Sequence, residues 1–356
     1  MQKSRRRCAY LLMGTLIFVS CGQADSSEPD QGIMDTGTTD TMVDTGPNPL
    51  DEGSSDQASS DEGAVDEGTV DEGDVGEGDE GNDVSEPPED TAAPELAPLP
   101  SAITQLDFTQ TVEGETVERF ALLHAPATID PDKVYPVFFL FHGNGGTPQF
   151  GPPKLGALVD SGAFVAVYPS GHLKSWNMGQ EQSKADDVAF VGMIIEKLAT
   201  YAQLDLDHMF SAGFSNGAGF SHKLAVETDH FQAIASMTSV LIQGGEPTEQ
   251  TARLSVLQVH GTEDGVCPYD GGPSPTGHVF HSTEESAQIW ADHNGCQTGP
   301  TQTETGQGNI RIAYSDCEEG TQVVHYGIVG AGHGLPPNTE GGIIALVWGF
   351  FQQSLQ

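Results

Sequence analysis

The sequence predicts an α/β fold with an open, mostly parallel sheet and helices on both of its faces. The segment 137–141 is apolar at every position, which is typical of a central strand that is covered on both sides. Strand-like and helix-like segments alternate in the C-terminal part of the chain, as they do in folds of this class. Glycine-rich and polar segments follow several strands, and reactive groups of open α/β sheets collect at the carboxyl ends of the strands.

Apolar or alternating runs mark the expected strands, and apolar residues at helical spacing mark the expected helices. Helices are expected from Val188 to Ala202, from Ala218 to Val226 and from Ile344 to Phe351. Together these elements predict one folded domain over residues 100–356. Strands are expected at residues 104–110, 117–123, 135–141, 163–168, 208–212, 232–238, 255–260 and 323–329.

The first 21 residues have the pattern of an export signal. A basic start precedes the apolar run from Ala9 to Val19, which is too short for a membrane-spanning helix, since that takes about 20 residues. Ser20 and Cys21 resemble the end of a bacterial lipobox, although Phe18 stands where leucine is usual. We therefore expect a lipoprotein-type signal peptide over residues 1–21 and a lipid on Cys21, with ordinary signal cleavage as the alternative. In either case the protein is expected outside the cytoplasm, free or at the outer cell surface.

Residues 22–99 are expected to form a disordered acidic linker. They contain 24 Asp and Glu but no Lys, Arg or His, and such a composition buries too little apolar surface to offset the entropy lost on ordering. The repeat DEGAV-DEGTV-DEGDV at 61–75 lacks the ligand spacing of a calcium loop, so an extended spacer is favoured. The domain itself keeps 28 acidic and 9 basic residues, which disfavours nucleic acid as a partner. We expect a monomer.

Three of the five cysteines fall in the expected domain: Cys267, Cys296 and Cys317. In an oxidising compartment, a bridge between Cys296 and Cys317 would close a loop of about 20 residues and stabilise the fold by about 3 kcal/mol. Cys267 would then be a free thiol. The sequence alone leaves other pairings open.

Residues 213–217 read Gly-Phe-Ser-Asn-Gly between an expected strand and an expected helix. In that context the pattern G-x-S-x-G indicates a sharp turn that holds a serine in a strained backbone conformation, with small residues two positions to either side. Ser215 is therefore the candidate nucleophile.

A serine hydroxyl needs a base to remove its proton and an acid to orient that base. In this fold the chain order is serine, acid, histidine. The strand at 255–260 is followed by Glu263 and Asp264, either of which could orient the base, and the strand at 323–329 is followed by a glycine-rich loop that contains His333.

The loop from Phe141 to Gly146, with the sequence FHGNGG, follows the buried strand. Its glycines allow backbone amides near Asn144 to point at a developing oxyanion, and the amide of Asn216 is the expected second donor. A phosphate cradle is the alternative, but the Lys and Ser/Thr of a P-loop are missing. The sequence contains no H-E-x-x-H and no Cys/His pair at zinc spacing, so we expect neither a metal nor a cofactor.

Taken together, the chain resembles the polyhydroxybutyrate depolymerase and feruloyl esterase family of secreted α/β-hydrolases. The motifs that carry the resemblance lie in the family's order between residues 105 and 354: HGNGG, YPSGHLKSWN, DDV, GFSNGAGF, HGTEDGVCPY and GAGHGLP. The family commonly has an aromatic residue after the last histidine, where this chain has Gly334 and Leu335. That difference bears on substrate preference.

The resemblance implies an α/β-hydrolase fold with Ser215, Asp264 and His333 as the triad, and it favours Asp264 over Glu263. It also implies a disulfide between Cys296 and Cys317, an oxyanion hole at Asn144 and Asn216, and Trp176 and Asn177 beside the substrate.

We therefore expect a secreted serine esterase that acts on an extracellular polymer or its fragments, either a polyhydroxyalkanoate or a plant wall carrying feruloyl or acetyl esters. One alternative is a serine peptidase, which shares the triad. Another is a non-catalytic surface lipoprotein that binds carbohydrate with a hydrolase scaffold.

Overall fold

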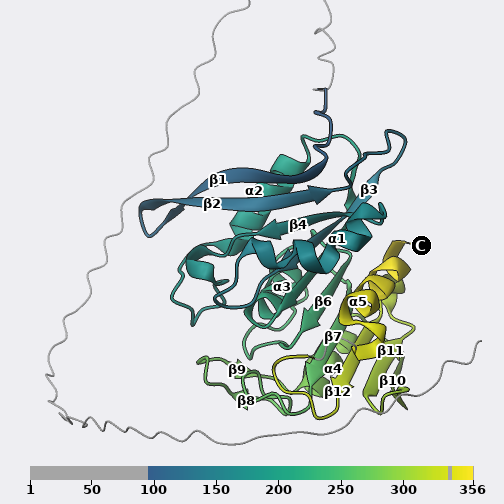
Figure 1. Cartoon of the computed structure of the whole chain (residues 1–356). Helices are drawn as coiled ribbons and strands as arrows, with labels where there is room; N and C mark the ends of the chain where they lie inside the picture. The colour runs from purple at the N-terminus through teal and green to yellow at the C-terminus, as the bar shows by residue number, and fades with distance from the viewer. Residues whose placement is uncertain (1–94, 336–338, 356) are drawn as a thin grey trace, which may run out of the picture. The chain divides into compact units, whose positions relative to one another are not determined.

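The computed structural model describes residues 95–335 and 339–355 (Figure 1). The expected signal peptide, Cys21 and the linker up to residue 94 lie outside these residues. The chain joins the domain before the expected boundary at residue 100, because the Ala97 amide donates to the Thr200 carbonyl at 2.8 Å and Leu99 is buried. Contacts with the domain thus begin at Ala97, three residues before the expected boundary.

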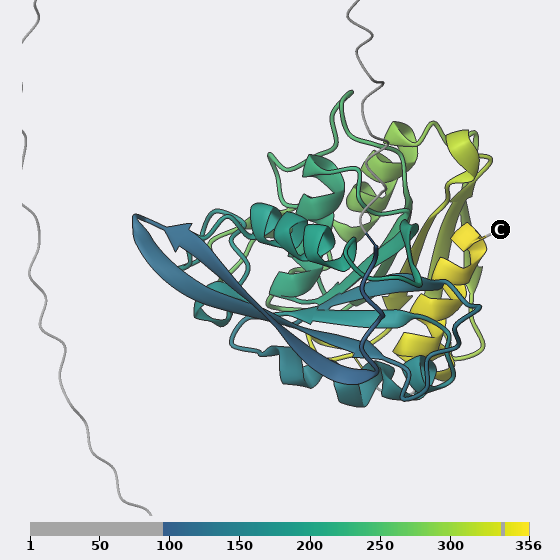
Figure 2. The same cartoon turned by 90° about the horizontal axis from the view of Figure 1, so that it is seen from above.

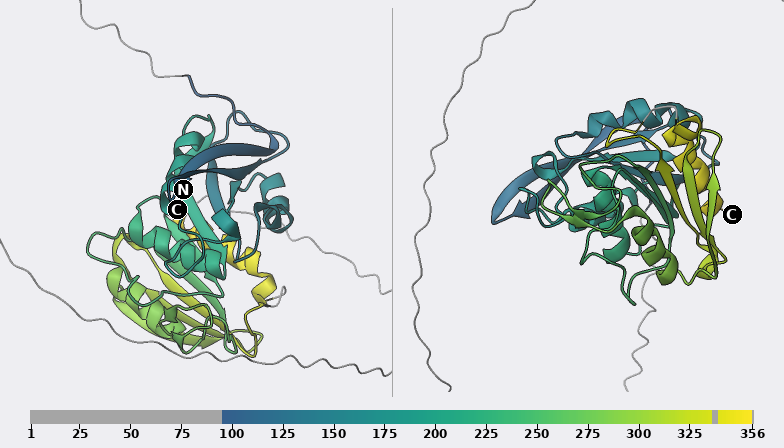
Figure 3. Two further views of the ribbon diagram at one scale, coloured as in Figure 1. Left: turned by 90° about the vertical axis from the view of Figure 1, so that its left-hand side faces the viewer. Right: turned by 90° about the horizontal axis from the view of Figure 1, so that it is seen from below.

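A ten-stranded sheet organises the fold, in the order β1-β2-β4-β3-β5-β6-β7-β12-β11-β10. The six strands from β4 to β12 in that order run parallel, and an antiparallel pair extends each edge. Figure 1 and Figure 3 show the two hairpins at opposite ends of the sheet. The strands are β1 (Ala102–Val112), β2 (Glu115–Ala125), β3 (Tyr135–Phe141), β4 (Val165–Pro169), β5 (Leu204–Phe214), β6 (Ala233–Met237), β7 (Ser255–Gly261), β10 (Thr298–Glu304), β11 (Ile310–Ser315) and β12 (Val323–Ile328).

Helices cover both faces of this sheet (Figure 2), as the all-apolar central strand predicts. Val137, Phe139 and Phe141 of β3 belong to one apolar core with residues of α2, α3 and α4, while Phe138 and Leu140 belong to a second core with residues of α1 and α5. The predicted α/β-hydrolase fold class is confirmed. The helices are α1 (Pro152–Asp160), α2 (Asp187–Leu198), α3 (Asn216–Glu227), α4 (Thr283–His293) and α5 (Ile343–Phe351).

Every strand and helix expected from periodicity is present, with ends that differ by a few residues. The helices α1 and α4, the β10–β11 hairpin and a short pair, β8 (Gly272–Pro273) with β9 (Val279–Phe280), have no counterpart among the expected elements. All seven residues of β10 are exposed, so this strand has no buried face that would impose an apolar alternation. No helix of the described residues is long and apolar enough to cross a bilayer.

Candidate active site

The candidate residues come together at the carboxyl ends of parallel strands. Asn144 follows β3, Ser215 follows β5, Asp264 follows β7 and His333 follows β12. The sheet order places β3 beside β5 and β7 beside β12, with β6 between the two pairs. Residues up to 189 positions apart in the sequence (144 to 333) therefore meet at one end of the sheet.

The backbone at Ser215 has φ 53° and ψ −120°, a strained conformation for a residue with a side chain. The turn is tight enough to require both flanking glycines. A Cβ on Gly213 would lie 2.1 Å from the Gly217 carbonyl oxygen, and one on Gly217 would lie 2.5 Å from the Phe141 carbonyl oxygen. The Ser215 amide donates to the Met237 carbonyl at 2.9 Å, which ties the turn to β6.

Ser215, His333 and Asp264 form a continuous chain of hydrogen bonds. The Ser215 Oγ lies 2.8 Å from His333 Nε2, and His333 Nδ1 lies 2.8 Å from Asp264 Oδ2. Because the carboxylate can only accept, Nδ1 carries the proton and Nε2 is left to accept from the serine hydroxyl. The Asp264 carboxylate is fully enclosed, whereas 28% of the His333 side chain is exposed. This arrangement can deprotonate a serine.

The surroundings of Asp264 keep its carboxyl ionised. Burial by itself would raise the pKa, but hydrogen bonds from His260, His333 and the amides of Cys267 and Val266 outweigh it and hold the pKa well below the ordinary value. The two amides reach Oδ1 at 3.0 and 2.8 Å. Glu263, the other sequence candidate, is exposed, and the geometry selects Asp264 as the residue that contacts His333.

Asn144 and Asn216 line a cavity of about 480 Å³ together with Ser215. The side chain of Asn216 is held in place, because Oδ1 accepts from the Trp176 amide at 2.7 Å and Nδ2 donates to the Trp176 carbonyl at 2.9 Å. The backbone amides of Asn144 and Asn216 have no acceptor within the described part of the chain. Unpaired amides beside a serine are what an oxyanion hole requires.

Trp176 lies elsewhere than the resemblance implies. Its side chain has no exposed surface, stacks on Phe220 at 5.0 Å between ring centroids, and donates from Nε1 to the His142 carbonyl at 2.8 Å. It is not among the residues that line the cavity at Ser215. A fully enclosed indole cannot touch a substrate without rearrangement. Trp176 therefore packs beneath the site, where its hydrogen bond to His142 supports the FHGNGG loop.

Asn177 likewise forms hydrogen bonds that stabilise the loop in which it lies. Its amide donates to Asp187 Oδ2 at 2.7 Å, and its side chain donates to the Ala185 carbonyl at 3.1 Å. Asp187 is in turn paired with the buried Arg119 at 2.7 Å. Trp176 and Asn177, which were expected beside the substrate, therefore lie behind the residues that line the cavity.

Glu181 and His278 form one wall of the cavity, and sequence reasoning gave neither of them a role. Glu181 Oε1 lies 2.8 Å from His278 Nε2 and accepts from Asn216 Nδ2 at 3.1 Å. His278 also lines a second cavity of about 510 Å³, which shares Met178 and Gln180 with the first. No sequence signal points to this pair, because its members are 97 residues apart and belong to no motif.

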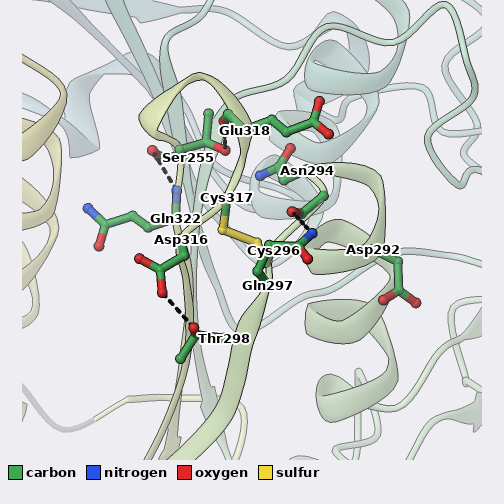
Figure 4. The surroundings of a disulfide bond; sticks show 12 residues. Ser255, Asp292, Asn294, Cys296, Gln297, Thr298, Asp316, Cys317, Glu318 and Gln322 are labelled. Atoms are coloured by element: carbon green, nitrogen blue, oxygen red, sulfur yellow. Dashed lines mark hydrogen bonds between the residues drawn. A yellow bond between two sulfur atoms is a disulfide. The ribbon is translucent and has the colours of Figure 1, made fainter.

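The structure joins Cys296, just after α4, to Cys317, just after β11 (Figure 4). Around the disulfide, the Glu318 amide donates to the Asn294 carbonyl at 2.9 Å, and Thr298 Oγ1 donates to Asp316 Oδ2 at 2.5 Å. Cys267 is a free, buried thiol, and it lines the cavity at Ser215. Within residues 95–335 and 339–355, no cluster of three or more His, Cys, Asp or Glu side chains is suited to hold a metal ion.

Comparison with known proteins points to esterases. The sequence is 28% identical to feruloyl esterase B of Piromyces equi over 232 residues, 60% of this chain but 42% of that protein. It is 28% identical to feruloyl esterase C of Emericella nidulans over 246 residues, 65% of this chain and 82% of that protein. The chain resembles feruloyl esterases. No family model matches it.

Among solved structures, an acetyl xylan esterase from Aspergillus awamori superimposes with a TM-score of 0.51 at 15% identity, covering 70% of this chain and 99% of that one. At this identity the likeness shows the fold alone. The chain therefore has an α/β-hydrolase scaffold. Its match spans less than half of the Piromyces protein.

Proposed function

We propose that this chain is a secreted serine esterase that cleaves ester bonds of an extracellular polymer or of its fragments. The observation that carries the proposal is the hydrogen-bonded chain Ser215–His333–Asp264 beside two unpaired backbone amides. Relatives that are named esterases support the coarser statement, hydrolysis of a carboxylic ester. The triad residues, the acyl-serine intermediate and the polymer substrate are the finer parts of the proposal.

In the first half-reaction, Ser215 Oγ attacks the ester carbonyl carbon while His333 Nε2 takes the hydroxyl proton. The carbonyl oxygen becomes an oxyanion, which the amides of Asn144 and Asn216 stabilise. Asp264 accepts from His333 Nδ1 and stabilises the imidazolium. The carbon–oxygen bond to the alcohol then breaks, His333 returns the proton to the leaving alkoxide, and an acyl-serine remains.

In the second half-reaction, water takes the place of the alcohol. His333 removes a proton from the water, and the resulting hydroxyl oxygen attacks the acyl carbon. The Ser215–acyl bond breaks, the proton passes from His333 to Ser215 Oγ, and the carboxylic acid leaves. The chain supplies every group that these steps use, so they require no cofactor.

The likeness to proteins named feruloyl esterases supports the proposed substrate class, and so does the mixed apolar and polar lining of the cavity. Apolar Phe280 and Val266 lie in the same cavity as polar Gln180 and His278, a mixed surface that suits an acyl group with polar substituents. Feruloyl or acetyl esters of a plant wall polymer, or a polyhydroxyalkanoate, are the proposed substrates.

The full-length chain should hydrolyse at least one of four esters: p-nitrophenyl butyrate, methyl ferulate, acetylated xylan and a polyhydroxybutyrate film. Ser215→Ala should lower the rate by a factor of about 10³ or more, because the triad acts as a unit. Product release measured for both proteins tests this, with unfolding curves to show that the variant is folded. Activity that survives in Ser215→Ala would refute the nucleophile, and silence on all four esters would favour the carbohydrate-binding alternative. Turnover of peptides alone would favour a peptidase.

A further inference from the structure

A second histidine contacts the acid of the triad. His260, near the end of β7, has no exposed surface, and its Nε2 lies 3.1 Å from Asp264 Oδ2 and 2.8 Å from the Cys267 carbonyl oxygen. Both neighbours are acceptors, so this nitrogen must carry a proton. His260 thus donates to Asp264 and to the Cys267 carbonyl together.

The other ring nitrogen of His260 fixes its charge state. Nδ1 is buried and has no hydrogen-bond partner within the described part of the chain. A proton there would leave a buried donor unpaired and place a positive charge in the core, which costs more than an unpaired acceptor nitrogen. His260 is therefore neutral, with its proton on Nε2.

Asp264 Oδ2 consequently serves two imidazoles, His333 and His260, while Oδ1 accepts from two amides. The other titratable groups that face His260 are Cys267, Tyr269 and His325. Burial raises the pKa of the Cys267 thiol to about 12, raises that of Tyr269, and lowers the pKa of His325 to about 3. Of the four groups, Asp264 alone carries charge at neutral pH.

We propose that His260 is a positioning residue that orients Asp264 toward His333 and takes up part of the carboxylate charge, which sets the pH at which the base becomes active. This inference rests on the proposed function of the same site. Without the His260 N–H, the whole carboxylate charge acts on His333 and stabilises its imidazolium form. Neutral His333, the form that accepts the serine proton, is then reached only at higher pH.

The matched variants are His260→Met and His260→Gln. The two side chains have similar length and shape, but only glutamine keeps an N–H that can reach both oxygens. The readouts are the acid limb of kcat/KM against pH and the NMR titration of the His333 ring, each in the full-length chain. In His260→Met we expect both midpoints to move up by about half a pH unit to one unit, because the loss of one hydrogen bond to a carboxylate is an effect of this size. In His260→Gln both midpoints should return toward the wild-type values. His260→Leu replaces the methionine variant if the latter does not fold.

A folded His260→Met protein with an unmoved acid limb and an unmoved His333 titration would overturn the inference, because a residue that merely fills space would lower activity equally at every pH. Failure of the proposed function gives a different result. If the wild-type protein shows no Ser215-dependent hydrolysis, the proposed esterase function is refuted. The NMR titration of the His333 ring still tests the role of His260 in that case.

Discussion

His222 and His325 are enclosed in the cores, and the contact of His222 with Trp290 determines which nitrogen of His222 carries the proton. The Trp290 indole can only donate, so its Nε1 at 3.1 Å makes His222 Nδ1 the acceptor. Tyr269 Oη lies 2.9 Å from His325 Nε2. Burial lowers the pKa of both histidines from 6.5 to about 3. Both rings are therefore neutral wherever the protein is folded at ordinary pH.

These histidines make stability depend on pH. The unfolded chain binds protons at them below about pH 6.5, whereas the folded chain does so only near pH 3, so their contribution is complete above pH 6.5 and is lost as the pH falls toward 3. Each histidine contributes a slope of at most about 1.4 kcal/mol per pH unit. In His222→Gln, the amide oxygen can still accept from Trp290 but cannot titrate, so the free energy of unfolding should fall less steeply between pH 6 and 4.

Urea unfolding at several pH values measures this slope. His230→Gln is the matched control, because it makes the same substitution at a partly exposed histidine in the loop after α3. Equal slopes for His222→Gln and the wild type would contradict the prediction.

At the scale of elements, the start of α3 is pressed against the end of β3. A Cβ on Gly217 would lie 2.5 Å from the carbonyl oxygens of both Phe141 and His142, so Gly217→Ala must push the helix away from the strand. We expect a loss of about 1–3 kcal/mol of stability from overpacking. We also expect kcat to fall at least tenfold, since both amides proposed for the oxyanion hole lie at this junction. Thermal unfolding and ester turnover measure the two effects.

Gly192→Ala provides the control within α2. A Cβ at Gly192 meets nothing within 4 Å, and alanine is favoured over glycine inside a helix by about 0.5–1 kcal/mol. This variant should be slightly more stable and equally active. A Gly217→Ala protein that behaved like Gly192→Ala would show that the contact is not tight in solution.

The sequence predicts those elements that are buried on one or both faces. Val137 to Phe141 could only be a central strand, and the glycines beside Ser215 and His333 mark loops at strand ends. The edge strand β10 was missed because its Thr-rich segment buries no side chain. The start of α4 did carry a signal, since Ser282 accepts from the Glu285 amide at 3.1 Å in a capping arrangement.

The positions of Ser215, Asp264 and His333 could be predicted because each lies in the segment that follows a strand. His260 belongs to the same HGTED motif as Asp264, yet nothing in the sequence shows that its ring turns back onto the carboxylate. Glu181 and His278 meet only after the chain has folded, so no motif marks them. For Trp176 the motif was misleading. We expected this aromatic residue beside the substrate, but its side chain is buried in the apolar core.

At the scale of the whole molecule, the lipobox-like segment that ends at Cys21 lies outside the described residues, and it adds an expected lipid anchor to the proposed enzyme. We expect Cys21 to carry a lipid, so that wild-type protein sediments with membranes and enters the detergent phase on phase separation. Cys21→Ser should shift the protein to the aqueous phase, because the acyl chains on Cys21 would supply the membrane affinity and the variant cannot carry them. Equal partitioning of both proteins would exclude lipidation at this position.

The outer strand β10 bears on how copies of this chain behave at high local concentration. An exposed strand edge normally invites pairing with another chain. Here Pro300 lacks an N–H for such pairing, and the register against β11 shifts between Thr298 and Thr301. This edge of the sheet therefore offers a poor template for β-pairing with another chain.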